Sequence, residues 1–78
     1  MATVNLIYFG SVTDITGISS ERADSPATLD ELNEMLKVRY PKLSVISYRF
    51  SVNRQLITGN RQLVDGDDIA LLPPFAGG

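Results

Sequence analysis

The chain ends in two glycines, and its terminal carboxylate is the group best placed to take part in chemistry. The last residues read Pro73-Pro74-Phe75-Ala76-Gly77-Gly78. Glycine has no Cβ, so the carboxylate of a terminal glycine can enter a narrow channel and be approached from any side. A frayed chain end also tolerates small residues. The two glycines alone are therefore compatible with a reactive tip and with a frayed end, and the residues before them are needed to choose between these interpretations.

Those residues favour a reactive tip that is inserted into a partner. Proline fixes φ, and the pair Pro73-Pro74 favours an extended, stiff stem of polyproline II type. Phe75 is a large apolar residue with no evident burial site so close to the end of the chain. An extended tail from Pro73 to Gly78 spans at most about 20 Å. We predict a flexible Gly-Gly tip on a stiff stem, with Phe75 as its anchor.

Other reactive groups are few. The chain has no His, Cys or Trp, which excludes a thiol nucleophile, an imidazole base and an ordinary zinc site. Asp65, Asp67 and Asp68 surround Gly66, but they lack the ligand spacing and closing Glu of a calcium loop. Turn formation explains them, so we expect no metal site. A reaction involving this chain would use the carboxylate of Gly78.

Composition limits the size, location and partners of the protein. Its 78 residues make one domain with a small core. The net charge is -2 and the seven basic residues are scattered, which argues against nucleic acid as a partner. The first residues do not have the pattern of a secretory signal peptide, in which an apolar stretch follows a basic one. The longest apolar stretch, residues 69–75, is too short for a membrane span. We expect a cytoplasmic protein without membrane contact.

The elements that must position the tail begin with a strand and a helix. Residues 3–9 are apolar on one face and partly apolar on the other, which predicts a central strand buried on much of both sides. Residues 18–24 predict a more polar edge strand paired with it. Between them, two glycines bracket an expected loop at 10–17. Thr28 and Glu31 form a capping-box pattern, and leucines at helical spacing follow. These features predict one main helix at about 28–39.

Three shorter strands are predicted after the helix, at 48–52, 55–57 and 68–72, with tight turns at 53–54 and 65–66. The first and last strands are the most apolar, so we expect them to be neighbours in the middle of a mixed sheet of four to five strands. One helix can cover one face of such a sheet, which makes the fold class α+β. The predicted organisation is a domain at 1–72 followed by an extended tail at 73–78.

The sequence resembles the small, sulfur-carrying subunits of molybdopterin synthase, which have the ubiquitin-like β-grasp fold. The C-terminal segment from Asp65 to Gly78 combines Gly-Asp, Pro-Pro and Gly-Gly in the manner of that family. The other matching segments are Ile7-Tyr8-Phe9-Gly10, Asp14-Ile15-Thr16-Gly17, Tyr40-Pro41-Lys42-Leu43 and Val52-Asn53. The chain departs from many relatives at Ser11 and Thr13-Asp14, where they have a basic residue and an Arg-Glu pair.

The resemblance implies a mechanism and a set of partners. An ATP-dependent activating enzyme would adenylate Gly78, and a sulfur donor would then convert the adenylate to a thiocarboxylate. Gly77 and Ala76 would enter the large synthase subunit with the tip, and Phe75, Pro74 and Pro73 would contact that subunit, in a heterotetramer. Sulfur would be delivered there to cyclic pyranopterin monophosphate. No cofactor would be bound stably by this chain.

Three alternatives remain open from the sequence. A sulfur carrier for thiamine biosynthesis would have the same fold and terminus, although Pro73-Pro74 and Tyr40-Pro41 favour the molybdopterin pathway. A ubiquitin-like modifier would pass the same activated carboxylate to lysine amines of other proteins. A β-grasp binding module would have no use for the tail, and loss of Gly78 would then change nothing.

Overall fold

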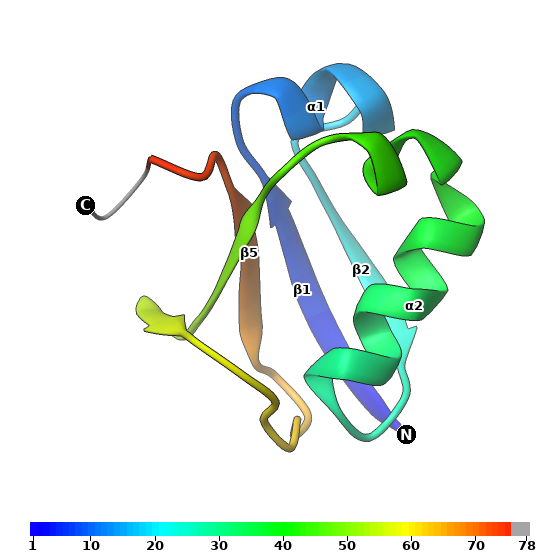
Figure 1. Cartoon of the computed structure of the whole chain (residues 1–78). Coiled ribbons are helices and arrows are strands. Elements are labelled where there is room, and N and C mark those ends of the chain that lie inside the picture. The colour runs from blue at the N-terminus through cyan, green and yellow to red at the C-terminus, as the bar shows by residue number, and fades with distance from the viewer. Residues whose placement is uncertain (76–78) are drawn as a thin grey trace.

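The protein is a five-stranded mixed sheet with one main helix across one of its faces (Figure 1). The computed structural model describes residues 1–75. The elements in chain order are β1 (Ala2–Tyr8), α1 (Ser11–Thr16), β2 (Ser20–Ser25), α2 (Leu29–Arg39), η1 (Pro41–Val45), β3 (Arg49–Val52), β4 (Gln55–Ile57) and β5 (Asp68–Leu72). The strand order is β2-β1-β5-β3-β4, which confirms the predicted α+β, β-grasp architecture.

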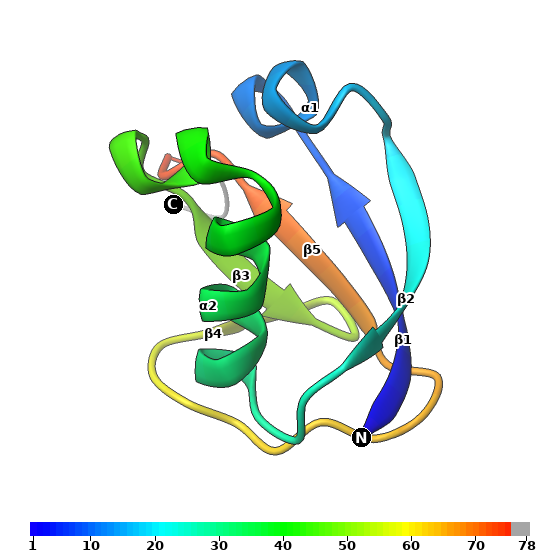
Figure 2. The same ribbon diagram turned by 90° about the vertical axis from the view of Figure 1, so that its right-hand side faces the viewer.

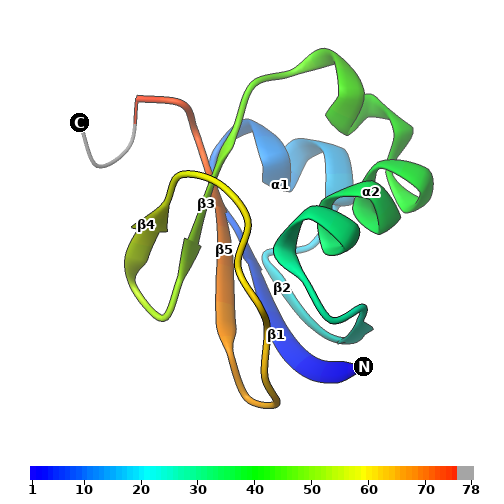
Figure 3. The ribbon, with the colours of Figure 1, turned by 60° about the horizontal axis from the view of Figure 1, so that its bottom comes forward.

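The first and last strands are neighbours in the sheet, as predicted. β1 and β5 run parallel, with Asn5 opposite Asp68 and Tyr8 opposite Leu71. β2 and β3 flank this pair as antiparallel neighbours, and β4 completes a hairpin at the far edge (Figure 3). Because side chains alternate along a strand, β1 buries one set of residues against α2. That set comprises Ala2, Val4, Leu6 and Tyr8.

Helix α2 lies where the capping and leucine patterns predict it. The Thr28 hydroxyl accepts a hydrogen bond from the Glu31 backbone N–H at 3.3 Å, which satisfies one of the free donors of the first turn. The leucines at 29, 32 and 36 are buried against the sheet. Figure 2 shows the helix packed on one side of the sheet, so the opposite side is left without a covering helix.

The expectation of a loop at residues 10–17 is wrong, because this segment contains the short helix α1. Val12 is fully buried and holds the helix against the core. Gly17 ends it with φ 77 and donates its N–H to the Thr13 carbonyl at 2.8 Å. β-Branched residues have low helix propensity, so the local sequence hides a helix that tertiary packing stabilises.

The acidic cluster near β5 serves the turns, as predicted. Asn53 and Arg54 have φ values of 51 and 70, as a tight turn between β3 and β4 requires. The Asn53 amide donates to Asp67 at 2.9 Å and accepts from the Asp68 N–H at 2.9 Å. Among residues 1–75, no group of three His, Cys, Asp or Glu side chains could hold a metal ion. No helix in this part of the chain is long and apolar enough to cross a membrane.

Candidate functional site

The sheet face opposite α2 carries an apolar surface next to the end of β5. Asn5, Ile7 and Phe9 alternate with the buried residues of β1, so their side chains point to this open face. Phe9 is 46% exposed, so part of its ring is accessible on the open face. A shallow pocket of about 320 Å³ follows the surface, lined by Ile7, Phe9, Ser51, Arg54, Asp68, Ala70 and Leu72. We call this surface the open-face patch.

The tail leaves the domain beside this patch, and glycine at position 10 allows it to do so. The Phe9 N–H donates to the Leu71 carbonyl at 3.2 Å, which holds the start of the tail against the end of β1. Gly10 has φ 57 and ψ -132, a conformation that side chains strongly disfavour. A Cβ at Gly10 would lie 2.9 Å from Cγ of Pro73. The absence of a side chain at Gly10 therefore sets the path of Pro73.

The structure places three of the six predicted tail residues. Pro73 is half-buried against Gly10, and Pro74 is exposed. Phe75 is 81% exposed, so it does not fold back into the core. Pro74 and Phe75 lie in a turn, and the predicted extended stem is therefore bent at this point. Ala76, Gly77 and Gly78 lie outside the described residues, and their predicted roles stay predictions.

Sequence reasoning missed two residues of this site, Phe9 and Gly10. We expected residues 3–9 to be buried on much of both sides, whereas nearly half of the Phe9 side chain is accessible. The signal that could have found it is the alternation itself, because Tyr8 belongs to the inner set and Phe9 to the outer one. Gly10 gave no such signal, since its contact with Pro73 joins residues far apart in the sequence.

A hydrogen-bonded polar cluster around Glu21 lies on the helix side of the sheet. The Glu21 carboxylate accepts hydrogen bonds from the hydroxyls of Tyr8 at 2.6 Å and Tyr40 at 2.8 Å, and from the Arg39 guanidinium at 3.3 Å. Burial and the bond to Glu21 raise the pKa of Tyr8 and the pKa of Tyr40 above their usual value. These hydroxyls therefore stay protonated near neutral pH. They join β1, β2 and α2 rather than supply an acid or a base.

The arrangement defines a ubiquitin-like β-grasp protein with an accessible apolar face beside its C-terminal stem. Residues 6–78 match the model of the ThiS family. The chain is 31% identical to the molybdopterin synthase sulfur carrier subunit of Mycobacterium tuberculosis, with 100% of each chain covered. The chain belongs to the ThiS family, among the molybdopterin synthase sulfur carrier subunits. The comparison confirms the family resemblance found in the sequence.

Solved structures share the fold over nearly the whole chain. The putative molybdopterin converting factor subunit 1 of Pyrococcus furiosus matches with a TM-score of 0.87 at 23% identity, over 95% of this chain and 99% of that one. The complex of subunits 1 and 2 of the molybdopterin-converting factor from Helicobacter pylori includes a chain that matches with a TM-score of 0.72 at 28% identity. That match covers 97% of this chain and 99% of the other. Small archaeal modifier protein 1 from Haloferax volcanii and Methanosarcina acetivorans has the same fold at 21–24% identity.

Proposed function

We propose that the protein carries sulfur on the carboxylate of Gly78 and delivers it within molybdopterin synthase, in the cytoplasm. The observation that supports this most is the exit of the C-terminal stem beside an exposed apolar patch, in a chain that belongs to a sulfur carrier family. The domain itself has no thiol or imidazole. The only unusual reactive group it contributes is its own terminus.

In the proposed reaction, an ATP-dependent activating enzyme first transfers AMP to the Gly78 carboxylate and releases pyrophosphate. The acyl-adenylate is then attacked by a sulfur donor, and AMP leaves as the C–S bond forms. The product is a thiocarboxylate at Gly78. Gly77 and Ala76, which carry little side chain, enter the active site of the large subunit with it. Two successive sulfur transfers to cyclic pyranopterin monophosphate there, each of which returns Gly78 to a carboxylate, build the dithiolene group.

The open-face patch and the stem would form the surface that the large subunit recognises. In the Helicobacter pylori structure, the matching protein is in complex with subunit 2 of the same factor, which supports a large subunit as the partner here. Phe75 is 81% exposed, and exposed aromatics next to a functional tail are typical interface anchors. Pro73 and Pro74 would hold Phe75 and the tip at a fixed distance from the domain. Two copies of each subunit would form the assembly.

Changing the terminus tests the proposal directly. Deleting Gly78, or adding two residues after it, should abolish thiocarboxylate formation and sulfur transfer while the unfolding temperature stays unchanged. The matched control adds two residues before Met1, which is 91% exposed, and should retain activity. Formation is measured by intact mass as the replacement of oxygen by sulfur. Sulfur transfer by the chain that lacks Gly78 would contradict the proposal.

A protein modifier is the second candidate, because the small archaeal modifiers share the fold. In that function a lysine amine attacks the acyl-adenylate, AMP leaves, and an isopeptide bond forms. Conjugation would add the 8.5 kDa of this chain to other cellular proteins. Finding such conjugates, with no thiocarboxylate in the free protein, would favour this function over sulfur transfer.

A further inference from the structure

Strand β2 is an edge of the sheet, and half of its backbone groups point away from the domain. β2 pairs with β1 on one side, and within residues 1–75 no strand pairs with its other side. The Tyr8 N–H donates to the Ser19 carbonyl directly opposite. Because bonded and non-bonded pairs alternate in an antiparallel ladder, Glu21 and Ala23 bond to β1. The N–H and C=O groups of Arg22 and Asp24 then point outward.

The register of β1 supports this assignment. The opposite partners of Arg22 and Asp24 are Asn5 and Thr3, whose backbone groups should then point to β5. They do, since the Asn5 N–H donates to the Asp67 carbonyl at 2.9 Å and the Thr3 carbonyl accepts from Gly66 at 2.8 Å. The outward groups of β2 are therefore free for another strand on the outer side.

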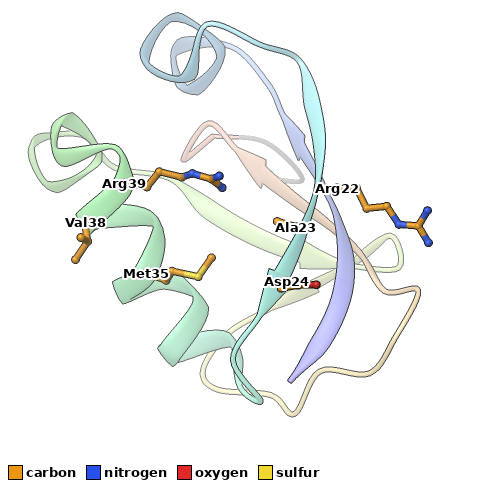
Figure 4. A pocket seen from close by; sticks show the side chains of 6 residues that line it. All are labelled: Arg22, Ala23, Asp24, Met35, Val38 and Arg39. Carbon is orange, nitrogen blue, oxygen red and sulfur yellow. The ribbon is translucent and has the colours of Figure 1, made fainter.

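Beside this edge lies a groove between β2 and α2, with a volume of about 620 Å³ (Figure 4). Its apolar lining consists of Ala23 from β2 and of Met35 and Val38 from α2. Val38 is 81% exposed. Figure 4 shows Arg22 directed away from the groove, while Met35 and Arg39 reach towards the strand. A second chain pairing with β2 would cover these apolar residues.

The charges along the edge indicate what that chain is. Arg22 and Asp24 both point to the open face and carry opposite charges two residues apart. If two copies of β2 pair antiparallel about a twofold axis at Ala23, Arg22 of each copy lies opposite Asp24 of the other. This is a hydrogen-bonded pair, so the free backbone groups match as well. A shift by two residues places Arg22 opposite Arg22, or Asp24 opposite Asp24, and like charges oppose such pairing.

We propose that β2 is a self-association edge, at which two copies of the chain form one continuous ten-stranded sheet with Arg22 and Asp24 paired across the axis. Opposite Ala23 residues then meet in the closely spaced, non-hydrogen-bonded position, where small side chains fit. The exposed Val38 and the half-buried Met35 side chains of both copies cover each other on the helix side. The Asp24 carboxylate also accepts from the Thr3 hydroxyl at 3.2 Å, which fixes its orientation. The stem follows β5, which is separated from the β2 edge by β1, so the stem stays accessible in both copies.

The contact is one strand edge and one helix flank, so we expect a weak dimer with a Kd on the order of 0.1 mM. Sedimentation and NMR of the full chain from about 20 μM to 1 mM would measure it. The amides of Arg22 and Asp24 should shift and gain exchange protection as concentration rises. The amide of Ala23, already bonded to β1, should be protected throughout. A chain that stays monomeric at 1 mM would overturn the proposal. This holds even if the β2 edge pairs with an added peptide of another sequence, because the proposed occupant is a second copy of this chain.

Charge reversal tests the register. Arg22→Asp and Asp24→Arg should each weaken the dimer by about tenfold or more, because symmetry applies each change twice. Combining R22D with D24R restores opposite charges and should recover most of the association. Both residues are exposed, so the variants are expected to fold, which unfolding in urea at low concentration checks. Failure of the double variant to recover association would also overturn the proposal.

Phe75→Ala separates this edge from the sulfur carrier function. It alters the stem alone and should leave dimerisation unchanged, even if it abolishes binding of the large subunit. A Phe75 variant that no longer dimerises would show that association runs through the stem instead of β2, and would overturn the proposal.

Discussion

The two faces of the sheet are built differently, although they alternate residue by residue along the same strands. On the helix face, β1 contributes Val4, Leu6 and Tyr8, all buried, and the Glu21 network joins the edge strand to the helix. On the open face, the neighbouring residues Ile7 and Phe9 remain accessible. The first face holds the domain together, and the second leaves apolar surface free.

This difference indicates that the helix face stabilises the domain and that the open face is available for binding. Single exposed apolar residues are common on protein surfaces, but here the exposed Phe9 and the half-buried Ile7 and Leu72 line one pocket next to the end of β5. A contiguous apolar surface on a small domain is typical of an interaction site. The comparison therefore predicts that substitutions on the helix face change stability, while substitutions on the open face and stem change binding.

The largest effect on stability should come from the helix face. Leu36→Ala removes a side chain that is 0% exposed and should lower the free energy of unfolding by about 2–5 kcal/mol. This is a large share of the about 5–15 kcal/mol available to a domain. Val45→Ala, at a residue 82% exposed, is the control and should change stability by less than about 0.5 kcal/mol. Urea unfolding measures both, and equal effects would break the comparison.

Phe75→Ala should show the opposite pattern. Its exposure predicts a change in unfolding free energy below about 0.5 kcal/mol. Loss of an interface anchor should weaken binding of the large subunit by about 2 kcal/mol or more. Thermal unfolding and titration calorimetry measure the two quantities. A drop in stability comparable to that of Leu36→Ala, with affinity unchanged, would make Phe75 a core residue.

How well the sequence predicts each region depends on the range of the interactions that shape it. Helix α2 follows from a local cap and a local leucine stripe, and β4 and β5 follow from short apolar runs between turns, so all three lie where predicted. Helix α1 was missed because burial of Val12 stabilises it. The open-face patch joins β1, β3 and β5, and such pairings at long sequence separation are not visible in a single sequence.

The Gly10 contact offers a test of how the stem is positioned. Gly10→Ala places a methyl group against Pro73, in a residue with φ 57. Gly17→Ala is the control, because φ 77 and ψ 0 place Gly17 in the left-handed region and an added Cβ meets nothing within 4 Å. Gly17→Ala should lose about 1–2 kcal/mol of stability from strain, and Gly10→Ala should lose at least as much, because ψ at Gly10 is -132. Only Gly10→Ala should also slow sulfur transfer to the large subunit, and equal transfer rates would show that the path of Pro73 is unimportant.

The smallest expected effect concerns the pH dependence of the helix face. Burial and the bond to Glu21 raise the pKa of Tyr8 and the pKa of Tyr40 above the ordinary value of 10.0. The folded state therefore holds these protons more tightly than the unfolded chain. Their contribution to stability is fully present below about pH 10 and is lost progressively as the pH rises above that value.

Urea unfolding at a series of pH values from about 8 to 11.5 measures this loss. The free energy of unfolding should be level at first and then fall, and Tyr40→Phe should make the fall shallower. At pH 7 the same substitution should lower stability by about 1 kcal/mol or less, because Glu21 keeps its bonds to Tyr8 and Arg39. Binding of the large subunit at pH 7 should be unchanged, since Tyr40 lies on the helix side. A Tyr40→Phe variant that folds normally but binds the large subunit poorly would show that the two faces are not independent.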